Sequence, residues 1–175
     1  MNLAPRARKL VLAIHLTVSV GWVGAALAYL ALALAVANSS DTSLIRASWL
    51  AMDLIGWFVL VPLAIGTLVT GLLLSFGTQW GLFRHYWVVI SFTLTTLATA
   101  ILVLHMPDVS TRASEAQGAN ASELGAMGSD LFHTSLGLVV LLIILVLNVF
   151  KPRGLTRYGW RRQQRERLPA LDKDR

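Results

Sequence analysis

Histidine and aspartate are the side chains of this sequence best suited to chemistry, and they lie in or beside long apolar segments. The four histidines are His15, His85, His105 and His133, and Asp53 lies early in the second apolar segment. Ionisable groups in lipid cost free energy, so each is a candidate functional residue. Imidazole suits copper, and imidazole beside carboxylate suits zinc or a proton relay. The chain has no cysteine, which excludes thiolate metal sites and covalent haem attachment.

His15 belongs to a polar face of the first apolar segment. Ser19, Trp22, Ala26 and Tyr29 follow it at spacings of 4, 7, 11 and 14 residues. These spacings place all five residues on one side of a helix. We expect this side to face the interior of a helix bundle, where His15 is either a ligand or a hydrogen-bonding partner of a neighbouring helix.

A second set of candidate ligands gathers at the other end of the apolar segments. His105 closes the third segment, His133 opens the fourth, and Asp53 lies near the start of the second. Asp130 and three methionines belong to the same end: Met52, Met106 and Met127. We expect His105 and His133 to approach one another with Asp53 close by, as a zinc, copper or proton-relay site. The alternative is that both histidines contact headgroups or water.

Four apolar blocks position these side chains. They cover about residues 10–36, 48–76, 86–106 and 131–150. Each has at least 20 residues, enough to cross a hydrocarbon core of about 30 Å. A barrel strand would alternate in polarity, which the run 136–147 does not. The pattern therefore predicts an all-α, four-helix transmembrane bundle over residues 1–155 and a basic tail over residues 156–175.

Charge predicts the orientation of this bundle. Of the 15 Lys and Arg residues, Arg46 and Arg112 alone fall on the side opposite the tail. Lys and Arg concentrate on the cytoplasmic side, so both termini are expected in the cytoplasm, with the bundle in a bacterial plasma membrane. The longest loop, residues 107–130, is then outside, and its ASELGAM stretch is expected to form a short helix.

The basic tail has its own expected partner. Anionic lipid headgroups attract basic residues that follow a last membrane helix. Nothing in the sequence resembles a nucleic-acid-binding fold or aromatic pattern, so no nucleic acid is expected. A membrane protein partner or a second copy of the chain is the other expected contact.

Two stretches resemble known families. HLTVSVGWVGA, which begins at His15, resembles the first helix of the copper-resistance protein D family and of the J-type protoporphyrinogen oxidases. Met52 to Val88 and Lys151 to Trp160 resemble an uncharacterised actinobacterial-type family of integral membrane proteins. The first resemblance implies a b-type haem with His15 as axial ligand. The oxidases use a basic residue deep in a later helix, which this sequence lacks, so their activity is not expected.

Three hypotheses follow. In the first, the chain is a redox or haem-handling protein that binds haem b through His15, with Trp22 and Tyr29 on the same face and Arg84 near the propionates. In the second, it handles metal or couples transport to metal or protons through the ligand set at the other end. In the third, it is an accessory membrane subunit with no chemistry of its own.

Overall fold

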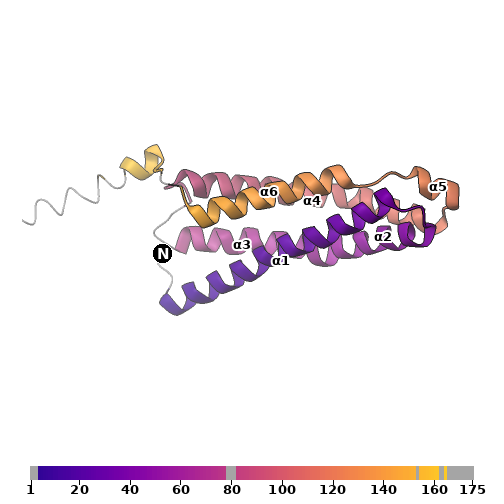
Figure 1. Ribbon diagram of the computed structural model, residues 1–175. Coiled ribbons are helices and arrows are strands. Elements are labelled where there is room, and N and C mark those ends of the chain that lie inside the picture. The colour runs from indigo at the N-terminus through magenta and orange to yellow at the C-terminus, as the bar shows by residue number, and fades with distance from the viewer. Residues whose placement is uncertain (1–3, 78–81, 153, 162–163, 165–175) are drawn as a thin grey trace, which may run out of the picture.

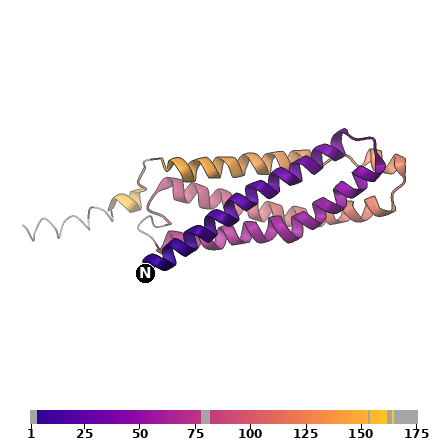
Figure 2. The same ribbon diagram turned by 60° about the horizontal axis from the view of Figure 1, so that its bottom comes forward.

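The protein is an antiparallel bundle of long helices. The computed structural model describes residues 4–77, 82–152, 154–161 and 164. Its helices are α1 (Pro5–Asn38), α2 (Thr42–Ile55), the π-helical segment η1 (Gly56–Leu60), α3 (Val61–Gly77), α4 (Tyr86–Gly118), α5 (Ala121–Ala126) and α6 (Leu131–Phe150). Figures 1 and 2 show α5 at one end of the bundle and the start of α1 at the other, the end at which residues 154–161 also lie. We call these the α5 end and the tail end.

Four helical rods are long and apolar enough to cross a membrane: α1, the continuous α2–η1–α3 rod, α4 and α6. Their outward faces carry large exposed apolar side chains such as Val20, Leu73, Leu142 and Val146, a surface that lipid would cover. The interior instead holds small and polar residues, including Ala33, Ala64 and several threonines. The structure thus confirms the all-α four-helix membrane bundle.

The rods differ in length, and the excess lies at the α5 end. α6 has 20 residues, or about 30 Å, while α1 has 34, or about 50 Å. The largest fully buried side chains gather in the excess: Ser48, Trp49, Met52, Met106, Val109 and Leu124. We call this packed region, formed by the ends of α1 and α4 with α2 and α5, the helical cap.

The cap corrects one expectation. Residues 107–130 were expected to form a loop after a helix that ends at Met106, but α4 continues through Pro107 to Gly118. Three residues of this stretch are buried at helical spacing: Val109, Ala113 and Ala116. Packing against the neighbouring helices therefore stabilises a helix in a segment whose composition is small and polar. The expected short helix is confirmed as α5, which begins with a capping box between Asn120 and Glu123.

The two arginines on this side stabilise the cap. An Nη of Arg46 donates a 2.8 Å hydrogen bond to the carbonyl of Ala119. An Nη of Arg112 donates one of 2.8 Å to the carbonyl of Met127, and its guanidinium lies 5.6 Å from the centre of the Trp49 ring. Both arginines therefore have structural partners at the α5 end.

The second rod begins earlier than expected, at Thr42, where Asp41 caps α2. The backbone N–H of Ser43 and its hydroxyl donate to the Asp41 carboxylate at 2.9 and 2.7 Å, and they hold the pKa of Asp41 below its ordinary value. Further along, η1 ends at Leu60, two residues before Pro62. Proline has no N–H and its ring would clash with the carbonyl four residues back, and the wider π-helical turn accommodates it.

Candidate metal centre

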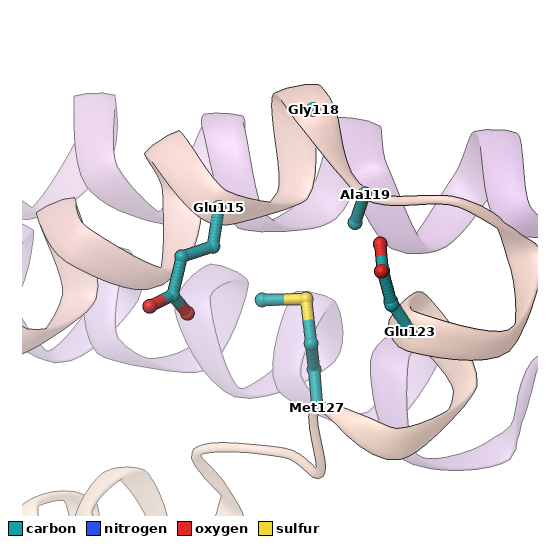
Figure 3. A pocket seen from close by; sticks show the side chains of 5 residues that line it. All are labelled: Glu115, Gly118, Ala119, Glu123 and Met127. Atoms are coloured by element: carbon teal, nitrogen blue, oxygen red, sulfur yellow. The ribbon is translucent and has the colours of Figure 1, made fainter.

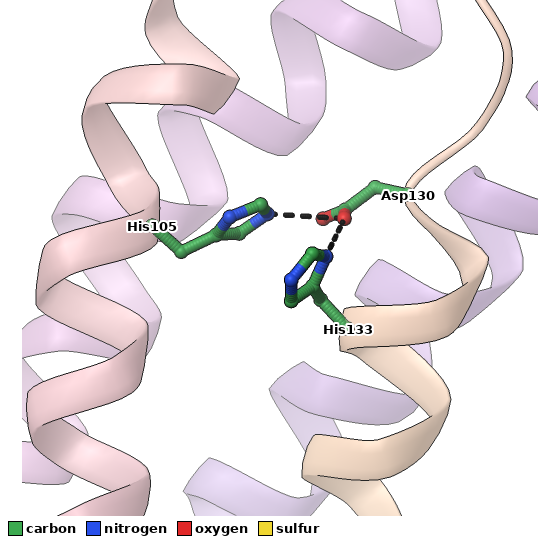
Figure 4. Close-up of side chains that lie close together, drawn as sticks. All are labelled: His105, Asp130 and His133. Atoms are coloured by element: carbon green, nitrogen blue, oxygen red, sulfur yellow. Dashed lines mark hydrogen bonds and ion pairs between the residues drawn. The ribbon is translucent and has the colours of Figure 1, made fainter.

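One carboxylate at the start of α6 joins two histidines from different helices. His105 Nε2 lies 3.0 Å from Asp130 Oδ1, and His133 Nδ1 lies 3.2 Å from the same oxygen. The two imidazole rings stack with centroids 4.1 Å apart. Figure 4 shows both rings directed at the Asp130 carboxylate. Because an ionised carboxylate only accepts hydrogen bonds, both ring nitrogens donate to it in this arrangement.

Local structure fixes the position of each of these three residues. His105 lies 19 residues beyond Tyr86 on α4, or about 29 Å along the helix, so it reaches the level where α6 begins. Gly128 adopts a φ of 67°, which glycine tolerates best, and the chain then enters α6. Asp130 and His133 are three residues apart in the first turn of α6, so their side chains lie on the same face.

Further groups surround the cluster. The Tyr29 hydroxyl donates to Asp130 Oδ2 at 3.4 Å from the bundle interior, and Tyr29 is buried. On the other side, the exposed carboxylate of Asp108 lies 3.9 Å from Nδ1 of His105. Both carboxylate oxygens of Asp130 therefore have partners within the protein, as a side chain that is only 7% exposed requires.

The three residues offer donor atoms suited to a metal ion. One donor atom each from His105, Asp130 and His133 lies within 4.8 Å of the other two. Two nitrogens and one carboxylate oxygen form a set that zinc accepts in tetrahedral sites, with a fourth position left for water. With a metal present, Nδ1 of His105 would carry the ring proton toward Asp108, the outer-shell arrangement common for metal-bound histidines.

The methionines are not part of this cluster. Met52 and Met106 are fully buried in the cap core, and the Met106 thioether packs against Gly56. Met127 lines a surface hollow between α4 and α5, shown in Figure 3, together with Glu115, Gly118, Ala119 and Glu123. Since thioethers are the ligands that favour Cu(I), the cluster is suited instead to zinc or Cu(II).

The expected approach of His105 and His133 is confirmed, but the carboxylate between them is Asp130. Asp53 accepts a 2.6 Å hydrogen bond from the Ser110 hydroxyl, and the Trp57 indole N–H donates to Ser110 Oγ at 2.9 Å. Asp53 thus contacts α4 through Ser110 and is not one of the three ligand residues of the cluster. The sequence signal for the bridging role was the Asp-x-x-His spacing of Asp130 and His133 at a helix start.

His15 lies near the tail end of the bundle. Its Nδ1 is 2.8 Å from the hydroxyl of Thr70, and that hydroxyl donates to the Gly66 carbonyl at 2.6 Å. The single hydroxyl proton is then used, so Nδ1 of His15 is the donor and Nε2 keeps its lone pair. Trp22 and Tyr29 are buried, which confirms that this face of α1 looks inward.

The residues expected around haem do not all gather at His15. Tyr29 lies 14 residues further along α1, or about 21 Å, and contacts Asp130 instead. Arg84 lies at the tail end, where its carbonyl accepts the N–H of Thr156 at 3.0 Å. His85 precedes the first turn of α4 and pairs with Leu155. Haem binding through His15 stays a prediction.

Fold and site together define a multi-pass helical membrane protein with a histidine–aspartate cluster at one end of its bundle. Comparison with protein-family models, curated proteins and solved structures finds no match to this chain.

Proposed function

We propose that the protein binds a zinc ion at the His105–Asp130–His133 cluster and handles this metal at the membrane surface. The observation that carries the proposal is the approach of three potential ligand atoms to within 4.8 Å of one another. One comes from α4 and two from the start of α6, so the fold brings them together. Cu(II) accepts the same donors and binds most such sites more tightly, so metal supply would decide between the two ions.

The exposure of the cluster indicates an exchangeable metal. Asp130 is buried, whereas the His133 side chain is 51% exposed. Three protein ligands leave a fourth position for water or for an incoming ligand, unlike the closed four-ligand sites that stabilise folds. This favours capture, delivery or sensing of metal over a purely structural role.

The distribution of charge supports a location of this site on the outer face. Most basic residues precede the first membrane helix or follow the last one in the sequence, and such residues concentrate in the cytoplasm. The α5 end, with the cluster and the helical cap, would then meet metal ions from outside the cell.

Metal titration of the purified protein tests the proposal. Protein in detergent, stripped with a chelator, should bind one Zn²⁺ per chain, and affinity should fall as pH is lowered because protons compete for the imidazole nitrogens. His105→Ala and His133→Ala should each abolish this binding, while His85→Ala at the tail end should retain it. Absence of stoichiometric Zn²⁺ or Cu²⁺ binding to the wild-type protein, or its persistence in the His105→Ala/His133→Ala double variant, would overturn the proposal.

A further inference from the structure

A second polar region lies inside the bundle near the tail end. Between Leu10 and Ala28, α1 has one titratable side chain, His15. The facing stretches have none: residues 56–77 on η1 and α3, 87–104 on α4 and 134–150 on α6. The nearest charged group on its own helix is Lys9, and Tyr86 lies at the tail end of α4. His15 is therefore isolated among neutral groups.

Three buried hydroxyl groups near the level of this histidine have no hydrogen-bond partner among the described residues. They are Ser19 Oγ, Thr67 Oγ1 and Ser91 Oγ. Thr67 and Ser91 are 7% and 6% exposed. Their neighbours Thr70, Thr95 and Thr99 donate instead to carbonyls of their own helices. Among the described residues the other buried polar atoms without a partner, on Arg46, Ser48 and Trp49, belong to α2 in the cap. A buried hydroxyl without a partner costs about 1–3 kcal/mol, and ordered water commonly satisfies such groups.

The three hydroxyls lie at nearly the same depth as His15. Ser19 is one helical turn from His15 on α1. Thr67 is about one turn from Thr70, the hydrogen-bonding partner of His15, and its backbone approaches the imidazole.

Ser91 reaches this level from α4. Met106 lies against Gly56, and α3 and α4 run in opposite directions. Fifteen residues back from Met106 is Ser91, and fifteen forward from Gly56 is Gly71, whose Cα faces the His15 ring. Helices α1, α3 and α4 thus bring four polar groups into one layer.

We propose that Ser19, Thr67 and Ser91 bind water molecules around the His15–Thr70 pair, forming a hydrated proton-exchange site within the membrane. Gly71 leaves room on one side of the imidazole, since a methyl group there would reach within 3.4 Å of His15 Cε1. The free lone pair on Nε2 of His15 accepts a proton from such water, and the imidazolium then releases its Nδ1 proton to another of these waters, which leaves neutral His15 protonated on Nε2. The site lies about 9 Å into the helix beyond Lys9, so water would enter from the tail end.

Removal of a single hydroxyl group tests whether that group binds water or lies dry in the bundle. Thr67→Val keeps shape and removes the hydroxyl, and Thr96→Val on the exposed face of α4 is the matched control. If Thr67 binds water, Thr67→Val lowers the Tm and slows exchange of the His15 ring proton with solvent, measured by NMR, by about tenfold. Ser91→Ala should act in the same direction, and Zn²⁺ binding should be unchanged in both variants.

Three results would overturn the proposal. A Tm that rises in Thr67→Val and Ser91→Ala would mean that the hydroxyls are unsatisfied and dry. Slow exchange of the His15 ring proton in the wild-type protein would mean that water does not reach it. A Soret band that is lost in His15→Ala would assign the imidazole to haem.

Discussion

Asp130 connects the membrane bundle to the cluster at its end. Its carboxylate accepts from two imidazoles through Oδ1 and from the Tyr29 phenol through Oδ2. A buried carboxylate is tolerated when such donors surround it. Tyr29 approaches from the bundle interior, so it sets the orientation of Asp130 and is a positioning residue for the proposed metal centre.

Removal of the Tyr29 hydroxyl tests this positioning role. Tyr29→Phe should weaken Zn²⁺ binding by about tenfold, the lower end of the range for outer-shell partners, because the carboxylate loses its fixed orientation. The measurement is competition titration with a zinc-sensitive dye, with Tyr158→Phe at the exposed tail end as the control. Unchanged affinity in Tyr29→Phe would exclude a positioning role and leave Tyr29 as a packing residue.

At the scale of elements, η1 and α4 position the cluster together. Met106 directly follows His105, and its thioether packs against Gly56 at the start of η1. Met106 is fully buried, so it fixes the rotation of α4 at the point where His105 must face α6. The wider turn before Pro62 is therefore part of the structure that presents the ligand.

A methyl group at Gly56 should disturb both packing and the site. A Cβ at this position would overlap the Met106 thioether, and overpacking of a buried contact costs about 1–3 kcal/mol. Gly56→Ala should lower the free energy of unfolding by this amount and also weaken Zn²⁺ binding.

Gly24→Ala is the matched control, because a Cβ there has no atom within 4 Å, and it should leave both quantities unchanged. Equal stability and zinc affinity of the two variants would show that α4 does not depend on the Gly56–Met106 contact.

At the scale of the whole molecule, the unequal lengths of the rods separate a membrane region from a cap. The α6 helix is just long enough to cross the hydrocarbon core, and Asp130 and His133 of the cluster lie at its start. The cap beyond this level has a core of large buried side chains, like a small soluble domain. The cluster therefore lies at the level where the cap joins the four apolar rods.

Single cysteines test which side of the membrane each end faces, because the natural chain has none. Ser122 lies on the exposed surface of α5, so the Ser122→Cys variant should react with an impermeant thiol reagent in intact cells. Tyr158→Cys, exposed at the tail end, should react only after lysis. Labelling in the reverse order would place the cluster on the cytoplasmic side and contradict metal capture from outside.

The sequence by itself determined the membrane bundle. Spans depend on local apolar composition over about 20 residues, and the backbone in lipid must satisfy its own hydrogen bonds, so four such blocks lead to four helices. The inward face of α1 and the meeting of His105 with His133 also followed from helical periodicity and antiparallel order. The spans and the inward face of α1 depend on residues close together in the chain, and the approach of the two histidines depends on the order of consecutive antiparallel spans.

Tertiary structure decided the rest. Asp130 rather than Asp53 lies between the histidines because the rotation of each helix, fixed by contacts such as Gly56 with Met106, selects which carboxylate points at the rings. The extension of α4 beyond Met106 depends on burial of Val109, Ala113 and Ala116 against other helices. Ligand geometry and burial arise between segments distant in the chain, and hydropathy, which is a local property, does not specify them.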